Sequence, residues 1–172
     1  VTLPIHYQTV DPSIGEIHLP VVMAPPASVE IADNAILLIN EDSREIDVSV
    51  SLYTDHIKGL LHLDAPKGWI ITPQAIVVDQ SYKDGTQNYR FTLHAEEDAA
   101  SGELLPMIKV GDTHYGKKEI VIDYPHIPKQ QFFIDASVPL QRMSINVPDV
   151  KVGYIAGAGD EIPEAINRLG LP

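Results

Sequence analysis

Strict alternation of apolar and polar residues is the feature that most restricts the fold of this chain. It is clearest between residues 46 and 52, where isoleucine, valine or leucine occupies every second position and aspartate or serine fills the positions between. Successive side chains of a strand point to opposite faces of a sheet, so one face of this segment is apolar and the other polar. The alternation therefore predicts a half-buried strand in an antiparallel sheet.

Similar short segments recur about every ten residues, a spacing that is typical of β-sandwiches. They cover residues 29–31, 60–63, 70–72 with 75–78, 89–93, 104–110 and 119–124. Turn-forming residues separate them, and Asp84-Gly85 is the clearest hairpin signal because both residues tolerate a tight reversal. The pattern predicts an all-β fold, with an immunoglobulin-like β-sandwich over residues 26–128.

Proline marks the two regions that flank the predicted sandwich. Residues 1–25 contain four prolines, which cannot donate ladder hydrogen bonds, so we expect an extended lead-in or an edge strand there. Residues 129–149 contain an apolar strand-like segment between prolines. We expect this second region to be a linker strand.

In the last part of the chain, residues 150–172, the spacing of apolar residues changes from that of a strand to that of a helix. Residues 150–155 read as a strand, Gly157-Ala158-Gly159 as a tight loop, and Asp160 as the N-cap of a helix. One face of this helix would carry Ile162, Ile166 and Leu169. A single strand–turn–helix unit cannot bury both faces of its strand, so we expect a truncated α/β unit. Its apolar helix face would pack on the sandwich or drive self-association.

Composition excludes several classes of function. The 172 residues include 24 acidic and 12 basic side chains, and the net charge of -12 argues against nucleic acid as a partner. Cysteine is absent, which excludes disulfides, zinc–thiolate sites and thiol nucleophiles. No apolar stretch approaches the length of a membrane span, so we expect none.

The sequence offers few candidates for catalysis. Its 7 histidines lack the spacings that place two metal ligands on one helix face. His62 and His94 fall in predicted strands, where pairing could bring them near Asp64 or Glu96. Serine-nucleophile motifs are missing as well. We therefore expect no catalytic residue, no metal site and no cofactor, and we do not expect this chain to be an enzyme.

Aromatic residues suggest one ligand-binding hypothesis. Trp69 is the single tryptophan, and together with Tyr82 or Tyr89 it could form a flat platform for sugar rings. The competing interpretation is structural. Trp69 follows a turn and opens a predicted strand, so it could instead close one end of the sandwich core.

The segment around Trp69 resembles a bacterial immunoglobulin-like module that is appended to glycosidases and sugar deacetylases. The resemblance lies in a G-x-L-x-L-x-x-P-x-G-W stretch matched by Gly59, Leu61, Leu63, Pro66, Gly68 and Trp69. The tail, from Gly153 to Gly170, looks like the start of an amidotransferase-like α/β domain. Together these features are similar to the later part of secreted PIG-L-type (LmbE-like) sugar deacetylases.

This resemblance implies a noncatalytic accessory domain in a secreted or periplasmic protein. The family's metal-binding His-x-Asp-Asp motif does not occur in this sequence, so no catalytic role is carried over to its residues. The chain would act as a spacer that positions neighbouring domains of the same polypeptide. A carbohydrate-binding module is the alternative function, and an adhesion domain that uses an edge strand is a third.

Overall fold

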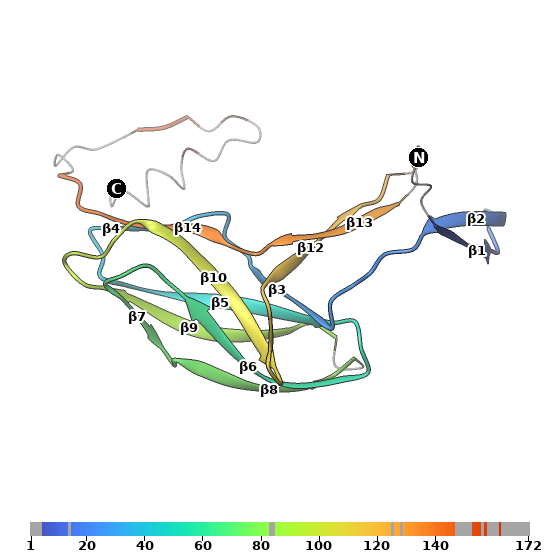
Figure 1. Cartoon of the computed structure of the whole chain (residues 1–172). Helices are drawn as coiled ribbons and strands as arrows, with labels where there is room; N and C mark the ends of the chain where they lie inside the picture. Colours follow the sequence, from blue (N-terminus) through green and yellow to red (C-terminus); the bar gives the residue numbers. More distant parts are fainter. Residues whose placement is uncertain are drawn as a thin grey trace.

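The computed structural model describes residues 5–13, 15–82, 85–124, 126–127, 129–146, 153–155, 157 and 162. Over these residues the chain forms an all-β fold in which two sheets face each other and two hairpins project from one end (Figure 1). The prediction of an all-β sandwich is confirmed. In this part of the chain, no helix is long and apolar enough to cross a membrane.

Two sheets build the sandwich. The smaller sheet is antiparallel and contains, in spatial order, β3 (Ala27–Ile31), β5 (Ser43–Leu52), β9 (Gln87–Ala95) and β7 (Trp69–Thr72). The larger sheet contains, in spatial order, β4 (Ile36–Ile39), β14 (Val138–Met143), β10 (Gly102–Val110), β6 (His56–Asp64) and β8 (Ala75–Ser81). A short strand, β11 (Thr113–Tyr115), adds to β10 as a hairpin.

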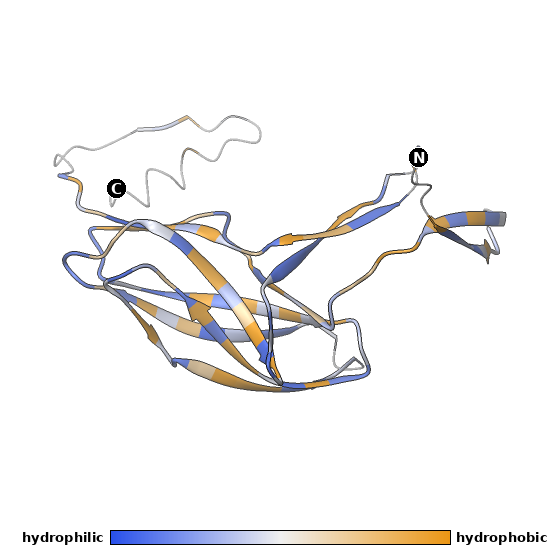
Figure 2. Cartoon of the chain, viewed as in Figure 1, coloured by the Kyte–Doolittle hydropathy of each residue, from blue (hydrophilic) through white to orange (hydrophobic). Residues whose placement is uncertain are grey.

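The core lies between these sheets and follows the alternation in the sequence. On β5 the residues Ile46, Val48, Val50 and Leu52 are buried, as their spacing predicts. The neighbouring strand β9 contributes Phe91, which is completely buried. Apolar and polar residues alternate along the sandwich strands (Figure 2), as expected when each strand has one face in the core.

The larger sheet corrects the expectation that residues 129–149 form a linker strand. β14 lies within this sheet, antiparallel to β10 and parallel to β4, and its residues Val138 and Leu140 are buried. Pro139 lies inside this strand although proline lacks an N–H donor, which is why the sequence suggested a linker. Residues 138–143 are therefore part of the sandwich.

Asn40 fastens the end of β4 to the end of β14. Its backbone has a positive φ of 56°, which asparagine tolerates better than most residues. The backbone N–H donates to the carbonyl of Met143 at 3.0 Å. The side-chain amide exchanges two hydrogen bonds of 2.9 Å with the backbone of Ile145. This contact joins segments that are 105 positions apart in the sequence.

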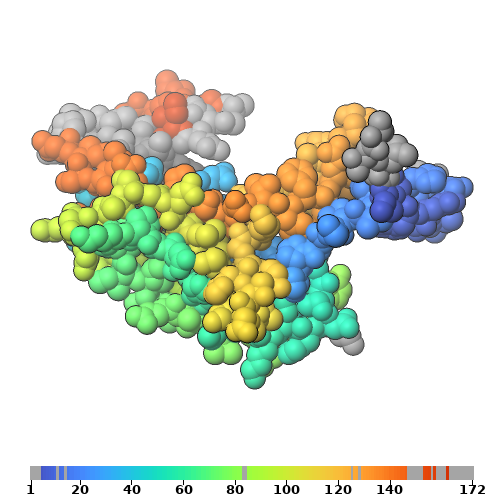
Figure 3. All heavy atoms as spheres, in the orientation of Figure 1, coloured from blue at the N-terminus to red at the C-terminus, as the bar shows by residue number. Residues whose placement is uncertain are grey.

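Two hairpins extend beyond the sandwich. The first consists of β1 (His6–Asp11) and β2 (Gly15–Pro20), which pair only with each other among the described residues. The second, which we call the arm, consists of β12 (Lys117–Ile122) and β13 (Gln130–Asp135). Both project from the same end of the sandwich body, on the right of Figure 3, where β1 and β2 are blue and the arm is light orange. The expected lead-in over residues 1–25 thus contains a hairpin.

Much of the predicted C-terminal α/β unit falls outside the described residues. Ile166 and Leu169, two of the three residues on the predicted helix face, belong to that part. The third, Ile162, is described and about half exposed. Gly153–Ile155 of the predicted strand are described and carry no strand assignment.

Candidate interaction site on the projecting arm

Trp69, the first predicted ligand-binding residue, lies in the core. Only 9% of it is exposed, and its Nε1–H donates to the carbonyl of Ala100 at 2.9 Å. The preceding turn hydrogen-bonds to the same loop, because Glu96 N–H donates to Gly68 and Ala100 N–H donates to Lys67, each at 2.9 Å. The ring therefore joins two loops at one end of the sandwich, which is the arrangement that the structural interpretation expects.

Gly68 has a specific reason to be glycine in this turn. Its φ of 83° lies in the left-handed region, and a Cβ atom there would come within 2.7 Å of the Cα of Ala99. The Gly68-Trp69 pair in the sequence motif is thus accounted for by the close contact of two loops.

The two predicted tyrosines do not join Trp69 in a common platform. Trp69 pairs with Ala95 on β9, whereas Tyr89 lies six positions earlier on that strand, a separation of about 20 Å along the strand. Tyr89 is partly buried against the core. Tyr82 is exposed and follows β8 on the other sheet. A surface hollow of about 610 Å³ lies beside Trp69, and Asp64 and Gln74 also line it.

The histidines that could have met across strands are also apart. His62 lies on β6 in the larger sheet and His94 on β9 in the smaller one, so the hypothesis that they share a site is wrong. His62 instead packs edge-to-face against His114, with ring centroids 5.6 Å apart, and its Nε2 lies 3.9 Å from Asp64. No group of three or more potential metal ligands occurs in the described residues.

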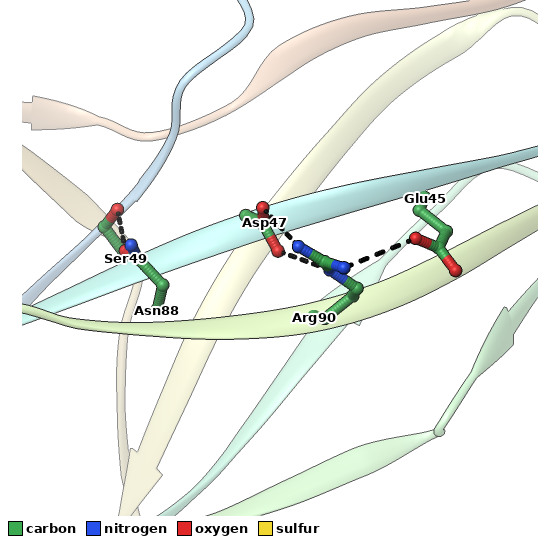
Figure 4. A network of polar contacts seen from close by, with 5 residues as sticks. All are labelled: Glu45, Asp47, Ser49, Asn88 and Arg90. Carbon is green, nitrogen blue, oxygen red and sulfur yellow. Dashed lines mark hydrogen bonds and ion pairs between the residues drawn. The ribbon is translucent and has the colours of Figure 1, made fainter.

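The outer face of the smaller sheet carries a ladder of polar pairs between β5 and β9 (Figure 4). Arg90 donates hydrogen bonds of 2.9 and 3.1 Å to both carboxylate oxygens of Asp47 and lies 3.6 Å from Glu45. These hydrogen bonds hold the pKa of Asp47 below its usual value. Ser49 donates to Asn88 at 2.8 Å. Because these exposed groups already pair with each other, we interpret this face as a solvated surface.

The arm is attached to the sandwich by a compact polar and aromatic contact. Tyr53, which follows β5, donates its hydroxyl proton to Glu119 of β12 at 2.6 Å and lies 3.1 Å from the hydroxyl of Ser28. Gln131 of β13 donates to the other oxygen of Glu119 at 2.5 Å. The ring of Tyr53 meets Phe133 edge-on at 5.2 Å. Both strands of the arm are thus held against the same tyrosine.

Burial, together with the hydrogen bond to Glu119, raises the pKa of Tyr53. An unfolded tyrosine loses its proton near pH 10, whereas the folded Tyr53 keeps its proton to higher pH. The unfolded state is then favoured as the pH rises through that range. We expect the free energy of unfolding to fall less steeply above about pH 10 in Tyr53→Phe than in the wild type, measured by urea titration. Equal slopes would contradict this assignment, and Tyr82→Phe is the matched control on an exposed tyrosine.

A groove runs beside the arm. It has a volume of about 720 Å³ and lies between residues 130–133 of β13 and residues 20–25, which we call the connector. A smaller hollow of about 150 Å³ continues it toward the first hairpin and is lined by Tyr7, Leu19 and Lys129 among others. Four consecutive residues of β13 line the groove, together with Lys117 of β12, so the groove runs along β13 over its whole depth.

The sequence indicates an apolar, strand-like segment within residues 129–149, but it does not predict the groove that residues 130–133 line. The signal that was present is the order of residues from Lys129 to Asp135, a basic end, an apolar centre and an acidic end. This order of charges indicates a pairing surface only when β13 is known to have an open edge.

Comparisons with known proteins add little to this geometry. No protein-family model and no curated protein matches the sequence. Among solved structures, the chain is similar to part of an E. coli alpha-2-macroglobulin, with 14% identity over 74% of this chain and a TM-score of 0.41. It spans only 7% of that protein. It also matches a conjugative transposon lipoprotein from Bacteroides eggerthii, with 9% identity over 64% of this chain and 97% of that one, and a TM-score of 0.33.

Proposed function

We propose that this chain is a noncatalytic, immunoglobulin-like module that holds neighbouring parts of a longer polypeptide at a defined distance and orientation. The observation that carries the proposal is the way the arm leaves the sandwich. β11 is separated from β12 by Gly116 alone, and β13 reaches β14 through two residues, of which Ala136 is completely buried. Such short connections restrict hinge motion, because few backbone angles are free to change.

The contact around Tyr53 supports the same function. It ties the arm to the sandwich at a point beyond the two short connections, so rotation of the arm would break hydrogen bonds to Glu119 and the ring contact with Phe133. A rigid projection of this kind suits a spacer. An enzyme would instead need ionisable groups that converge in a pocket.

The motif resemblance extends this proposal to a cellular setting. The G-x-L-x-L-x-x-P-x-G-W stretch and the predicted α/β unit over residues 150–172 favour an accessory domain of a secreted or periplasmic PIG-L-type sugar deacetylase. In that setting the module would need no cofactor. Its partners would be the neighbouring domains of the same polypeptide.

A distance measurement tests the spacer function directly. Because the chain lacks cysteine, two exposed sites, Val77 on the sandwich and Val121 on the arm, can be changed to cysteine and spin-labelled. We expect a single narrow distance distribution in protein diluted with unlabelled chain, and a broader one after Tyr53→Ala. A distribution that is already broad in the parent protein would overturn the proposal.

Carbohydrate binding is the second candidate, and the hollow beside Trp69 is the feature that favours it. Sugar platforms need an exposed aromatic face, whereas this ring is almost completely covered. Calorimetric titration with oligomers of N-acetylglucosamine is therefore expected to show no heat of binding. Binding that disappears in Gln74→Ala, with the fold unchanged, would replace the spacer proposal with this one.

A further inference from the structure

The second strand of the arm presents an unpaired edge. Within the described residues β13 pairs with β12 alone, and the groove lies along its other side. An exposed strand edge carries backbone donors and acceptors that can pair with another strand. The edge of β13 is therefore a candidate site for strand addition.

One hydrogen bond identifies which backbone groups face the open side. Ala136 N–H donates to the carbonyl of Gly116 at 3.0 Å, and this pair continues the register in which Lys117 lies opposite Asp135. In an antiparallel ladder, hydrogen-bonded and non-hydrogen-bonded pairs alternate. The even-numbered residues of β13 thus bond to β12, and the odd-numbered ones, from Gln131 to Asp135, direct their N–H and C=O groups to the open edge.

The residues along this edge are self-complementary in charge. Lys129 stands just before the strand and Asp135 at its end, with Phe132 midway between them. If a second copy runs antiparallel with Phe132 opposite itself, each Lys129 lies opposite Asp135 of the other copy. The same register sets odd-numbered residues opposite odd-numbered ones, which is the parity that the outward-facing backbone groups require. Charge and backbone geometry therefore select the same alignment.

We propose that two copies of this chain associate by antiparallel pairing of their β13 edges, with Phe132 on the twofold axis. In this register the two Phe132 residues form a non-hydrogen-bonded pair, in which side chains approach most closely, and aromatic pairs are favourable there. Phe132 is 41% exposed in the single chain, so it has apolar surface to bury. On the other wall of the groove, Val21 and Met23 of the connector can contact the second copy through their apolar side chains. Met23 is 93% exposed in the single chain.

The charged ends are available for such pairing. Lys129 lies 3.5 Å from Asp123, and Lys117 lies 3.0 Å from Asp135, but all four side chains are well exposed. Exposed ion pairs contribute little to stability, so Lys129 and Asp135 can exchange these partners for each other across the two copies at little cost. A single strand edge buries a limited area, and the association is therefore expected to depend on protein concentration.

Cysteine cross-linking tests both the partner and the register. The chain has no cysteine of its own, so Phe132→Cys introduces one thiol per copy at the twofold axis. With copper–phenanthroline and dissolved oxygen as the oxidant, we expect rapid formation of a disulfide-linked dimer, because the facing Cα atoms of such a pair lie within disulfide range. Ile134→Cys, an exposed neighbour two residues away, is the matched control and should stay monomeric. Equal cross-linking of both variants, or of Ile134→Cys alone, would overturn the register.

Charge reversal tests the association without cross-links. In a dimer of Lys129→Glu, the introduced glutamate of each copy lies opposite Asp135 of the other copy, and in a dimer of Asp135→Lys, each introduced lysine lies opposite Lys129. Like charges then meet at two places, so each variant should weaken dimerisation by about tenfold or more, measured by sedimentation equilibrium. Mixing the two variants should restore dimers, because every charged pair is then of opposite sign. Circular dichroism and the melting temperature confirm that each variant is folded. A wild type that stays monomeric at all concentrations, or a mixture that does not recover, would overturn the proposal.

Discussion

Replacing Trp69 with alanine is expected to lower the free energy of unfolding by about 3–5 kcal/mol, which is typical for removing a buried aromatic ring. The ring fills one end of the core and its N–H satisfies the carbonyl of Ala100, so the change leaves both a cavity and an unpaired acceptor. Urea denaturation followed by circular dichroism measures the loss. Because the chain contains one tryptophan, tryptophan fluorescence cannot report on this variant.

Trp69→Phe separates the two contributions. Phenylalanine keeps most of the ring but cannot donate to Ala100, so we expect a smaller loss of about 1–3 kcal/mol. Tyr82→Ala is the matched control on an exposed aromatic residue and should change stability by less than about 1 kcal/mol. A Trp69→Ala variant as stable as that control would mean that the ring lies on the surface. It would then be available to a sugar.

Leu140→Ala is expected to destabilise the protein by about 2–5 kcal/mol, the usual range for truncating a buried leucine. Leu140 is only 1% exposed and lies on β14, between β4 and β10 in the larger sheet. A linker strand outside the core would tolerate the same substitution. The measurement therefore tests directly whether the sandwich includes the segment that follows residue 128.

A matched control for this variant lies on the neighbouring strand. Leu37 belongs to β4 and pairs with Gln141, but it is 40% exposed. Leu37→Ala removes the same atoms from a position that faces water, so its effect should be clearly smaller, at most about 1 kcal/mol. Equal effects of the two substitutions on the urea midpoint would argue against a buried β14.

Part of the candidate site on the arm could be predicted from the sequence, and part could not. The apolar centre of β13 indicated a strand, because strand periodicity is a property of neighbouring residues. The arm itself depends on contacts between distant segments. Tyr53, Glu119 and Gln131 come from three separate strands or turns, and no local pattern distinguishes them from other surface residues.

The sequence by itself determined that the described sandwich region is all-β, and on β5 it determined which residues face the core. It could do so because the alternation of side chains between the two faces of a strand is set by the local backbone. Trp69 shows the limit of this local information, because the sequence left open whether its ring binds a sugar or closes the core.

Only the tertiary structure decided which strands are neighbours and which edges stay open. The parallel pairing of β4 with β14 joins segments that the chain separates by most of the sandwich, and it places a proline-containing strand inside a sheet. His62 packs against His114 and not against His94, because His62 and His94 belong to different sheets. Strand pairing depends on the free energy of the whole fold, in which distant hydrogen bonds and core contacts must offset the entropy of closing long loops.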